Sequence, residues 1–331
     1  MTNLLSAQFS RLFKSKIFYL SLIFFIGLAM FLVLPGYIDH FIHFDLYSQD
    51  FDFWRFSSLM GPLRFGPADP EWILSYDSDF FDSLYNTRLY ADYCMKAGYT
   101  PYIAVIAVLA SLLIGGEFDN NTIRNKLIAG YSRAAVYISN LIVCITAGII
   151  MQIVYMTAAL IPLLILYIKY KAADCSVFLF EFTFKENAVF QLTGLAIIVV
   201  YSSVFLFFTM ISASRSRAVL VSLIAAAALI IFGKSVEQTL YPEEYYETFL
   251  DNYFSDDFID EKEELREKSL SGAKRDIYQF IDDVLAIRQS YFISKCDKIP
   301  PRTGRYIIYD FGITAVTAAA GIIIFNRKEL K

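Results

Sequence analysis

Charged residues are scarce in this chain of 331 residues. Only 19% are Asp, Glu, Lys or Arg, whereas about a quarter are charged in a typical soluble domain. Hydrophobic residues make up 56%, and the mean hydropathy is +0.47. This composition excludes an ordinary soluble enzyme and an intrinsically disordered protein. With only four cysteines, the sequence is also unlike a disulfide-rich secreted scaffold.

Residue types that hold metals and cofactors are equally rare. The two histidines, His40 and His43, stand three apart, which is a weak metal signal, and interfacial polar residues are the other interpretation. Gly233-Lys234-Ser235 looks like the end of a phosphate-binding loop, but Ala228 stands where that motif needs glycine. No G-x-S-x-G or H-E-x-x-H motif occurs in the sequence. We therefore expect no enzymatic activity, no metal and no cofactor bound by this chain itself.

Long apolar blocks stand in place of the missing charges. A transmembrane helix needs roughly 20 predominantly apolar residues, and four uncharged blocks reach that length. The alternating pattern of an outer-membrane barrel is absent from the sequence. The four blocks lie between Lys16 and Asp39 (22 residues), Lys96 and Glu117 (20), Arg133 and Lys169 (35), and Glu186 and Arg215 (28).

Two further blocks, 218–233 and 311–326, have only 16 residues each. At 1.5 Å per residue they reach about 24 Å, less than the ~30 Å hydrocarbon core. A snorkelling Lys234 and an earlier start at Tyr306 would extend them. The sequence therefore predicts an all-α polytopic membrane protein with six transmembrane helices and two long, largely helical extracellular segments.

The expected order begins with an amphipathic interfacial helix at 1–16, for which the start of the first span is the other interpretation. The transmembrane helices are expected at 17–38, 101–116, 134–168, 188–211, 218–233 and 306–326. A coupling helix at 117–133, a loop at 212–217 and a tail at 327–331 are expected in the cytoplasm, and 39–100, 169–187 and 234–305 outside.

Charge sets this orientation. The segments that share a side with the termini carry eleven basic and three acidic residues. Lys and Arg accumulate in short cytoplasmic loops, so both termini are expected inside. The sequence pI of about 5.4 arises from the outer segments and indicates no nucleic-acid partner.

The outer segments leave two interpretations open. An apolar stripe in 234–305 predicts a small helical cap packed on itself and on the span ends, and a substrate-contacting or partner-docking surface is the alternative. That stripe consists of Ile277, Phe280, Ile281, Val284, Leu285 and Phe292. Cys94, Cys175 and Cys296 are expected outside, where a disulfide is allowed, but no spacing selects a pair; Cys144 is expected inside a span.

One cytoplasmic segment, 114–133, carries the functional signal. Asn120 and Asn121 can cap a short helix that Gly130 would end as a C′ glycine. We expect Ile123, Leu127 and Ile128 on one face of this helix and Arg124, Asn125 and Lys126 on the other. A short amphipathic helix of this kind suits docking in a groove of a cytoplasmic partner.

The run E-F-x-N-x-T-I-R-N-K-L-I-A-G-Y-S-R in this segment resembles the permease subunits of ABC-2 type exporters. The detailed resemblance covers roughly 100–170, and the rest of the chain resembles the family only in topology. Many members of that family have Gly before the Thr, where this chain has Asn121, and Asn also tolerates a left-handed backbone. The resemblance implies that this helix couples to a separate ATPase through Glu117, Thr122, Ile123, Arg124, Lys126, Leu127 and Arg133.

The resemblance further implies an exporter in the plasma membrane of a bacterium, with two ATPase copies and a second permease chain as homodimer or heterodimer. ATP and magnesium would be bound by the partner ATPase. Two alternatives remain: the Arg and Lys only anchor at lipid headgroups, or the chain is a polytopic membrane sensor or scaffold with an extracellular helical cap. The sequence leaves the transported substrate open.

Asp310 is the only carboxylate expected within a span. Ionisable residues inside spans are functional candidates, and Thr314 lies one turn further on. The two residues form our candidate translocation path, and an interfacial acid near the outer headgroups is the alternative.

Overall fold

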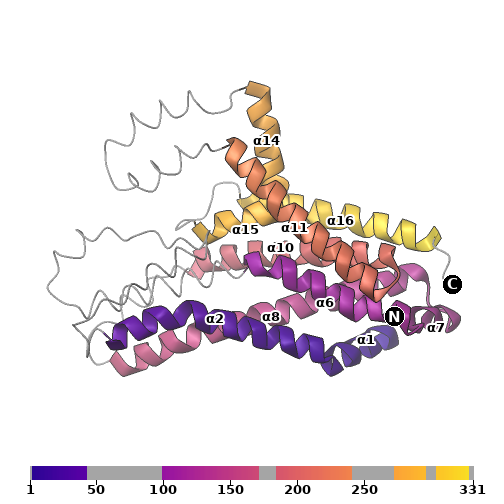
Figure 1. Cartoon of the computed structure of the whole chain (residues 1–331), viewed down its shortest axis with the longest axis horizontal. Helices are drawn as coiled ribbons and strands as arrows, with labels where there is room; N and C mark the ends of the chain where they lie inside the picture. The colour runs from indigo at the N-terminus through magenta and orange to yellow at the C-terminus, as the bar shows by residue number, and fades with distance from the viewer. Residues whose placement is uncertain (1, 43–98, 171–183, 241–271, 296–302, 328–331) are drawn as a thin grey trace.

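A computed structural model of the chain describes residues 2–42, 99–170, 184–240, 272–295 and 303–327 (Figure 1). Throughout these residues the regular elements are α-helices, with no strand, as the sequence predicts. The helices are α1 (Thr2–Lys14), α2 (Lys16–Ile42), α6 (Tyr99–Asp119), α7 (Thr122–Ile128), α8 (Arg133–Tyr170), α10 (Phe184–Ser212), α11 (Arg215–Leu240), α14 (Gly272–Val284), α15 (Ala286–Lys295) and α16 (Thr303–Arg327).

Five helices of the described part are long and apolar enough to cross a membrane. They contain Pro101–Asp119, Arg133–Ala159, Gln191–Ser212, Arg215–Leu240 and Thr303–Arg327. α2 meets the same test only together with α1, so the sixth span stays a prediction. The described part of the molecule is thus all-helical and compatible with a multi-pass membrane protein.

The two short apolar blocks belong to long helices. α11 has 26 residues and α16 has 25, because polar residues at both ends of each block continue the helix. At 1.5 Å per residue each is roughly 38 Å long, enough for a ~30 Å core. The short uncharged blocks therefore underestimate the length of these two helices.

The N-terminal helix is separate from the one that follows it. α1 and α2 meet at 59° around Ser15, so α1 is not a straight continuation of α2. Leu4, Gln8 and Leu12, one turn apart, are buried where α1 contacts α8. The amphipathic helix predicted here thus packs on the bundle with the face that contains these residues.

α10 lies at the centre of the bundle and contacts α6, α8, α11 and α16. Hydroxyl groups connect these helices: Ser111 Oγ on α6 donates to Ser222 Oγ on α11 at 2.9 Å, and Ser203 of α10 bonds Thr317 of α16. Small polar residues that join helices in this way are common where lipid surrounds the bundle.

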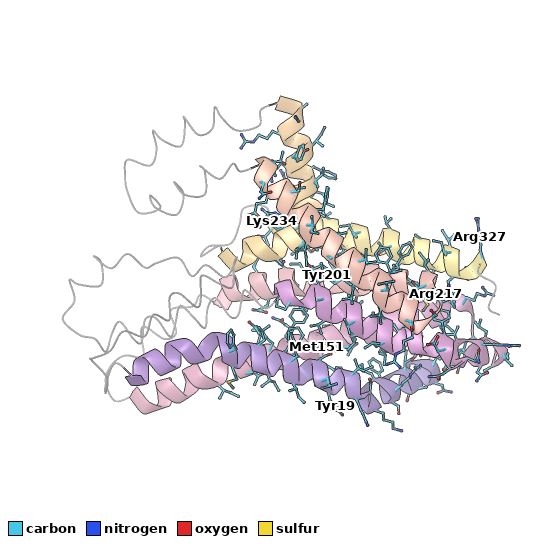
Figure 2. All side chains as sticks on the ribbon, in the orientation of Figure 1. Tyr19, Met151, Tyr201, Arg217, Lys234 and Arg327 are labelled. Carbon is cyan, nitrogen blue, oxygen red and sulfur yellow. The ribbon has the colours of Figure 1, made fainter. Side chains whose placement is uncertain are left out.

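The start of α1, the end of α16 and α7 all lie at one end of the bundle (Figure 1). Arg217 and Arg327 lie at this end too, whereas Lys234 is further along α11 (Figure 2). Gly115 permits a close approach here, because a Cβ at this position would meet the Arg215 Cα at 2.9 Å. We refer to this region as the α7 end.

α14 projects from the bundle beside the far end of α11 (Figure 1). The apolar stripe predicted there is not buried as a unit, since Ile277 is 59% and Phe280 55% exposed. Asp282 and Asp283 are buried instead, because α14 turns this face toward α15, where Arg288 pairs with Asp282 and Gln289 donates to the backbone carbonyl of Asp283. Most of 39–100 and 169–187, part of 234–305, all of the tail except Arg327, and the three outer cysteines lie outside the described residues. Cys144 is buried in α8 as expected.

Candidate functional site

α7 begins after Asn121 and ends before Gly130, the two residues from which the sequence predicts its ends. Asn121 is the N-cap residue with φ 54°, the left-handed conformation that Asn tolerates, but its side chain forms no capping hydrogen bond, contrary to our expectation. Gly130 has φ 89°. The Gly130 N–H donates to Leu127 O and the Tyr131 N–H to Lys126 O, which is the Schellman pattern.

The two faces of α7 differ from the prediction at two positions. Ile123 is buried and Leu127 partly buried, but Ile128 is 74% exposed and Lys126 points inward. At 3.6 residues per turn, Ile128 lies about 140° around the helix from Ile123, whereas Lys126 lies only about 60° away. The exposed face therefore consists of Asn121, Arg124, Asn125 and Ile128.

The carboxylate of Glu117, at the end of α6, is the centre of this region. Glu117 is 1% exposed. Its Oε1 lies 2.6 Å from Nη1 of Arg11 on α1, and Nζ of Lys126 lies 2.7 Å from both of its oxygens. One buried acid thus joins α1, α6 and α7.

Two amides extend this network to α8. Nδ2 of Asn140 donates to Glu117 Oε2 at 3.5 Å, and Nε2 of Gln8 donates to Asn140 Oδ1. Arg11 also donates from Nη2 to the backbone carbonyl of Leu113 at 3.1 Å. We call Gln8, Arg11, Glu117, Lys126 and Asn140 the Glu117 network.

Burial lowers the pKa of Lys126, and the adjacent Glu117 carboxylate opposes this shift. Desolvation and the repulsion by the nearby Arg11 charge together therefore outweigh the attraction of the ion pair at this lysine. A buried charge of this kind depends on its partner, because a charge left alone in a protein interior is strongly unfavourable.

Two further contacts hold neighbouring elements at the α7 end. Nη1 of Arg133, at the start of α8, donates to Phe325 O at 2.6 Å and to Asn326 O at 3.2 Å in the last turn of α16. Its guanidinium also lies 5.8 Å from the centre of the Phe325 ring. The Asp119 carboxylate accepts from the backbone N–H of Arg215 at 3.3 Å, at the start of α11.

The predicted coupling residues therefore have two kinds of surroundings. Glu117, Lys126 and Arg133 bond to other helices of this chain, and Ile123 is buried. Arg124 is exposed, while Thr122 and Leu127 are partly exposed. Gln8, Arg11 and Asn140 complete the network and were not identified as site residues from the sequence. Asn140 could have been noticed, because it is an amide within the apolar block 134–168.

Asp310 and Thr314 lie on the inner side of α16. Asp310 is 1% exposed and Thr314 partly buried, and the carboxylate and hydroxyl oxygens of both lack a hydrogen-bond partner among the described residues. The side chain of Gln289 on α15 lies against the Asp310 carboxyl. The two candidate residues thus face other helices rather than the surface.

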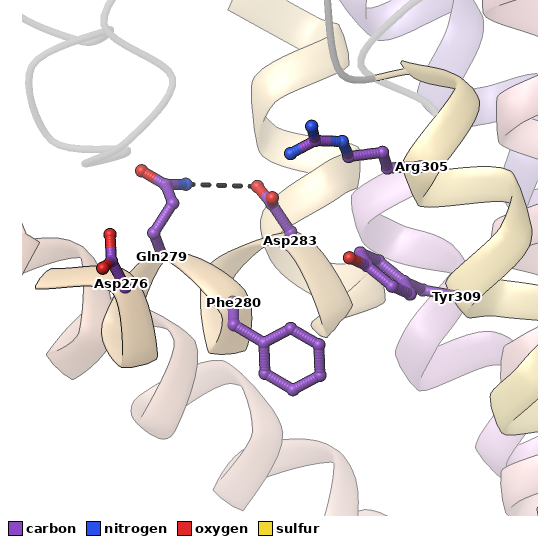
Figure 3. A pocket seen from close by; sticks show the side chains of 6 residues that line it. All are labelled: Asp276, Gln279, Phe280, Asp283, Arg305 and Tyr309. Carbon is purple, nitrogen blue, oxygen red and sulfur yellow. Dashed lines mark hydrogen bonds between the residues drawn. The ribbon is translucent and has the colours of Figure 1, made fainter. Parts of the chain in front are cut away.

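A cavity of about 260 Å³ lies between α14 and α16 (Figure 3). Its aromatic side is formed by Phe280 and Tyr309, whose rings meet edge to face at 5.6 Å. Its polar lining consists of Asp276, Gln279, Asp283 and Arg305, with Gln279 Nε2 donating to Asp283 at 3.1 Å. Acids and an arginine together suit a small molecule that carries both an ammonium and a carboxylate group.

The His/Cys/Asp/Glu side chains within the described ranges form no group of three or more that could hold a metal ion. Comparisons of this chain with protein-family models, with curated proteins and with solved structures found no match.

Proposed function

We propose that this chain is the membrane-spanning permease subunit of an ABC-2 type exporter, driven by a separate ATPase that docks on α7. The observation that supports this most is the construction of the α7 end. A short helix with an exposed cationic and apolar face is joined to three other helices by buried polar groups, mainly Glu117.

This construction suits force transmission. A partner that moves α7 would act directly on Glu117 through Lys126, and Glu117 is bonded to α1 and α8 as well. Buried ion pairs break only at considerable energy, so the four helices would shift together. ATPase closure would then tilt the spans between inward-open and outward-open arrangements.

The exporter would have the partners and the location that the family resemblance implies. Two ATPase copies would bind ATP and magnesium, while this chain performs no hydrolysis. A second permease chain, identical or related, would complete the path, and Asp310 and Thr314 would line it. The chain would lie in a bacterial plasma membrane with six spans and with both termini and α7 in the cytoplasm.

The exposed face of α7 provides the test of coupling. Arg124→Glu combined with Ile128→Asp should reduce co-purification of the ATPase at least tenfold, because it reverses the charge and removes the apolar contact at once. Arg124 is exposed and Ile128 is 74% exposed, so the chain itself should keep its thermal unfolding midpoint. Pull-down from solubilised membranes and a melting curve measure the two effects.

Arg217→Glu is the matched control. This exposed arginine lies at the same end of the bundle, on α11, and should leave ATPase capture unchanged (Figure 2). If the α7 double variant still captured the ATPase and transported normally, α7 would not be the coupling helix. If wild-type chain captured no ATPase at all, the exporter proposal itself would fail.

A polytopic sensor is the second candidate function, and the cavity between α14 and α16 favours it. A sensor requires a ligand site, and this cavity combines an aromatic side with both signs of charge. A sensor would respond to its ligand without ATPase. Co-purification of an ATPase would therefore favour the exporter over the sensor.

Topology is tested with two cysteines at opposite ends of the molecule. Ile277→Cys on α14 should react with a membrane-impermeant thiol reagent in intact cells, and Ile128→Cys on α7 only after the cells are opened. Both positions are more than half exposed, so access depends on the side of the membrane. Cys94, Cys175 and Cys296 are replaced by serine, and Cys144 is buried.

The unsubstituted Cys144 background should remain unlabelled before and after opening. Equal labelling of both new cysteines in intact cells would contradict the assignment of α7 to the cytoplasm. Labelling of both only after opening would place α14 in the cytoplasm as well, which would leave four spans.

A further inference from the structure

Several buried oxygen atoms without hydrogen-bond partners lie where α10, α15 and α16 meet. They comprise both carboxylate oxygens of Asp310, the hydroxyls of Thr314 and Tyr201, and Oε1 of Gln289, all unpartnered within the described part of the chain. Most buried polar atoms in proteins are hydrogen-bonded, so such a concentration is unusual. We call these four residues the Asp310 cluster.

The positions of these residues bring the oxygens together. Thr314 follows Asp310 by one helical turn and shares its face of α16. The side chain of Gln289 lies against the Asp310 carboxyl, and the Tyr201 hydroxyl lies beside Ser290 of the same helix, α15, near enough to Asp310 to interact with its charge. Tyr201 lies inside the bundle, on α10 (Figure 2).

Neighbouring donors are occupied elsewhere. Nε2 of Gln289 donates to the backbone carbonyl of Asp283 at 2.8 Å, and Oγ of Ser290 donates to Ile287 O at 2.7 Å. Asp310 itself forms no ion pair with any residue that the structure describes. Among the described residues the carboxylate thus has no cationic side chain and no well-formed hydrogen bond to compensate its burial, and the side chain of Gln289 is the polar group that lies against it.

Protonation of Asp310 would explain only some of the unpartnered oxygens. A protonated Asp310 could donate one hydrogen bond, which would satisfy one acceptor and leave the other oxygens unpartnered. A cation contacts several oxygens at once, at about 2.3–2.6 Å from each in the case of calcium. The oxygens of these four residues accept no hydrogen bond within the described part of the chain, so their lone pairs are free to contact an ion.

We propose that the Asp310 cluster is a binding site for one desolvated monovalent cation, either an alkali metal ion or the ammonium group of a solute. The single carboxylate sets the charge, because a divalent ion would leave an excess positive charge buried between helices. Hydroxyl and amide oxygens complete the coordination without adding charge. This proposal concerns the chain alone and does not depend on its having an ATPase partner.

The test measures thermal unfolding of the purified full chain in lipid nanodiscs. Sodium, potassium and methylammonium chloride are compared with N-methylglucamine chloride at constant ionic strength. A thiol-reactive dye reports unfolding through the buried Cys144, with the other three cysteines replaced by serine. A ligand that binds only the folded state raises the melting temperature in proportion to its occupancy.

We expect a saturating rise in melting temperature with at least one small cation and none with bulky N-methylglucamine. Asp310→Asn should abolish the rise. Thr314→Val should raise the half-saturating concentration about tenfold, equivalent to about 1.4 kcal/mol. Thr317→Val is the matched control on the same helix, since its hydroxyl bonds Ser203 and the backbone, and it should leave that concentration unchanged.

The salts distinguish the two sources of the cation. A response to sodium or potassium alone indicates a metal ion, and a response to methylammonium indicates an ammonium group; either supports the site. An equal melting temperature in all four salts, or a response that survives Asp310→Asn, overturns it. If Asp310→Asn does not fold, the two threonine variants decide instead. Equal half-saturating cation concentrations in Thr314→Val and Thr317→Val would then overturn the proposed site.

Discussion

Glu117→Gln is expected to destabilise the chain by about 3–5 kcal/mol, the range found when one member of a buried ion pair is removed. The substitution keeps the size of the side chain but leaves Arg11 and Lys126 without the anion that lies 2.6–2.7 Å from both. The side chain of Lys126 is only 12% exposed, so water cannot replace the lost partner. The free energy of unfolding in detergent micelles measures this effect.

The same variant should uncouple α7 from the bundle. With Lys126 released, α7 keeps its exposed face but loses its bond to α6, so ATPase binding should persist while transport falls at least tenfold. ATPase capture and export by one preparation provide the two readouts. Unchanged export would contradict the proposed role of the Glu117 network.

The pH dependence identifies the cause of the destabilisation. The pKa of Lys126 is already lowered by burial, and loss of the opposing Glu117 charge should lower it further. Between that lowered pKa and the ordinary pKa of lysine, the unfolded chain binds more protons than the folded one, so stability rises with pH. The deficit of Glu117→Gln should therefore shrink in alkaline solution, and Glu117→Gln with Lys126→Met should recover part of the stability at neutral pH.

Arg288→Met is the second substitution with a large expected effect. Nη1 of Arg288 lies 2.6 Å from Glu237 Oε2 on α11, and Nε donates to Asp282 Oδ1 on α14 at 2.6 Å. The side chain of Arg288 is 3% exposed and that of Asp282 1%. Methionine would leave Asp282 buried without this cation, and we expect a loss of about 3–5 kcal/mol, together with loosening of α14 from α11.

This loss should respond to pH in the opposite direction. Burial raises the pKa of Asp282 and Arg288 opposes the shift, so the pKa should rise further in the variant. Between the ordinary pKa of aspartate and this raised value the folded chain binds more protons than the unfolded one, so stability falls as pH rises. The deficit should shrink in mildly acidic solution, and Arg288→Met with Asp282→Asn and Glu237→Gln should recover stability. A deficit independent of pH would contradict the explanation by unpaired charge.

Local patterns determined the helices of this protein. Uncharged blocks predict where the long helices run, because a helix surrounded by apolar groups needs only its own residues to satisfy its backbone. Asn121 and Gly130, at the two ends of α7, both have positive φ angles. Few other residues adopt this left-handed backbone conformation without strain. The lengths of α11 and α16 were underestimated because polar residues extend both helices beyond their apolar blocks.

The tertiary structure decided which polar residues meet. Gln8 and Asn140 are hydrogen-bonded although 132 positions separate them, and no local spacing encodes such a pair. The sequence predicts the helices that contain Glu117 and Lys126. Whether these two side chains contact a partner protein or each other depends on how α1 and α8 pack beside them. Periodicity fixes the faces of a helix, whereas the neighbours of each face arise only when segments distant in sequence come together.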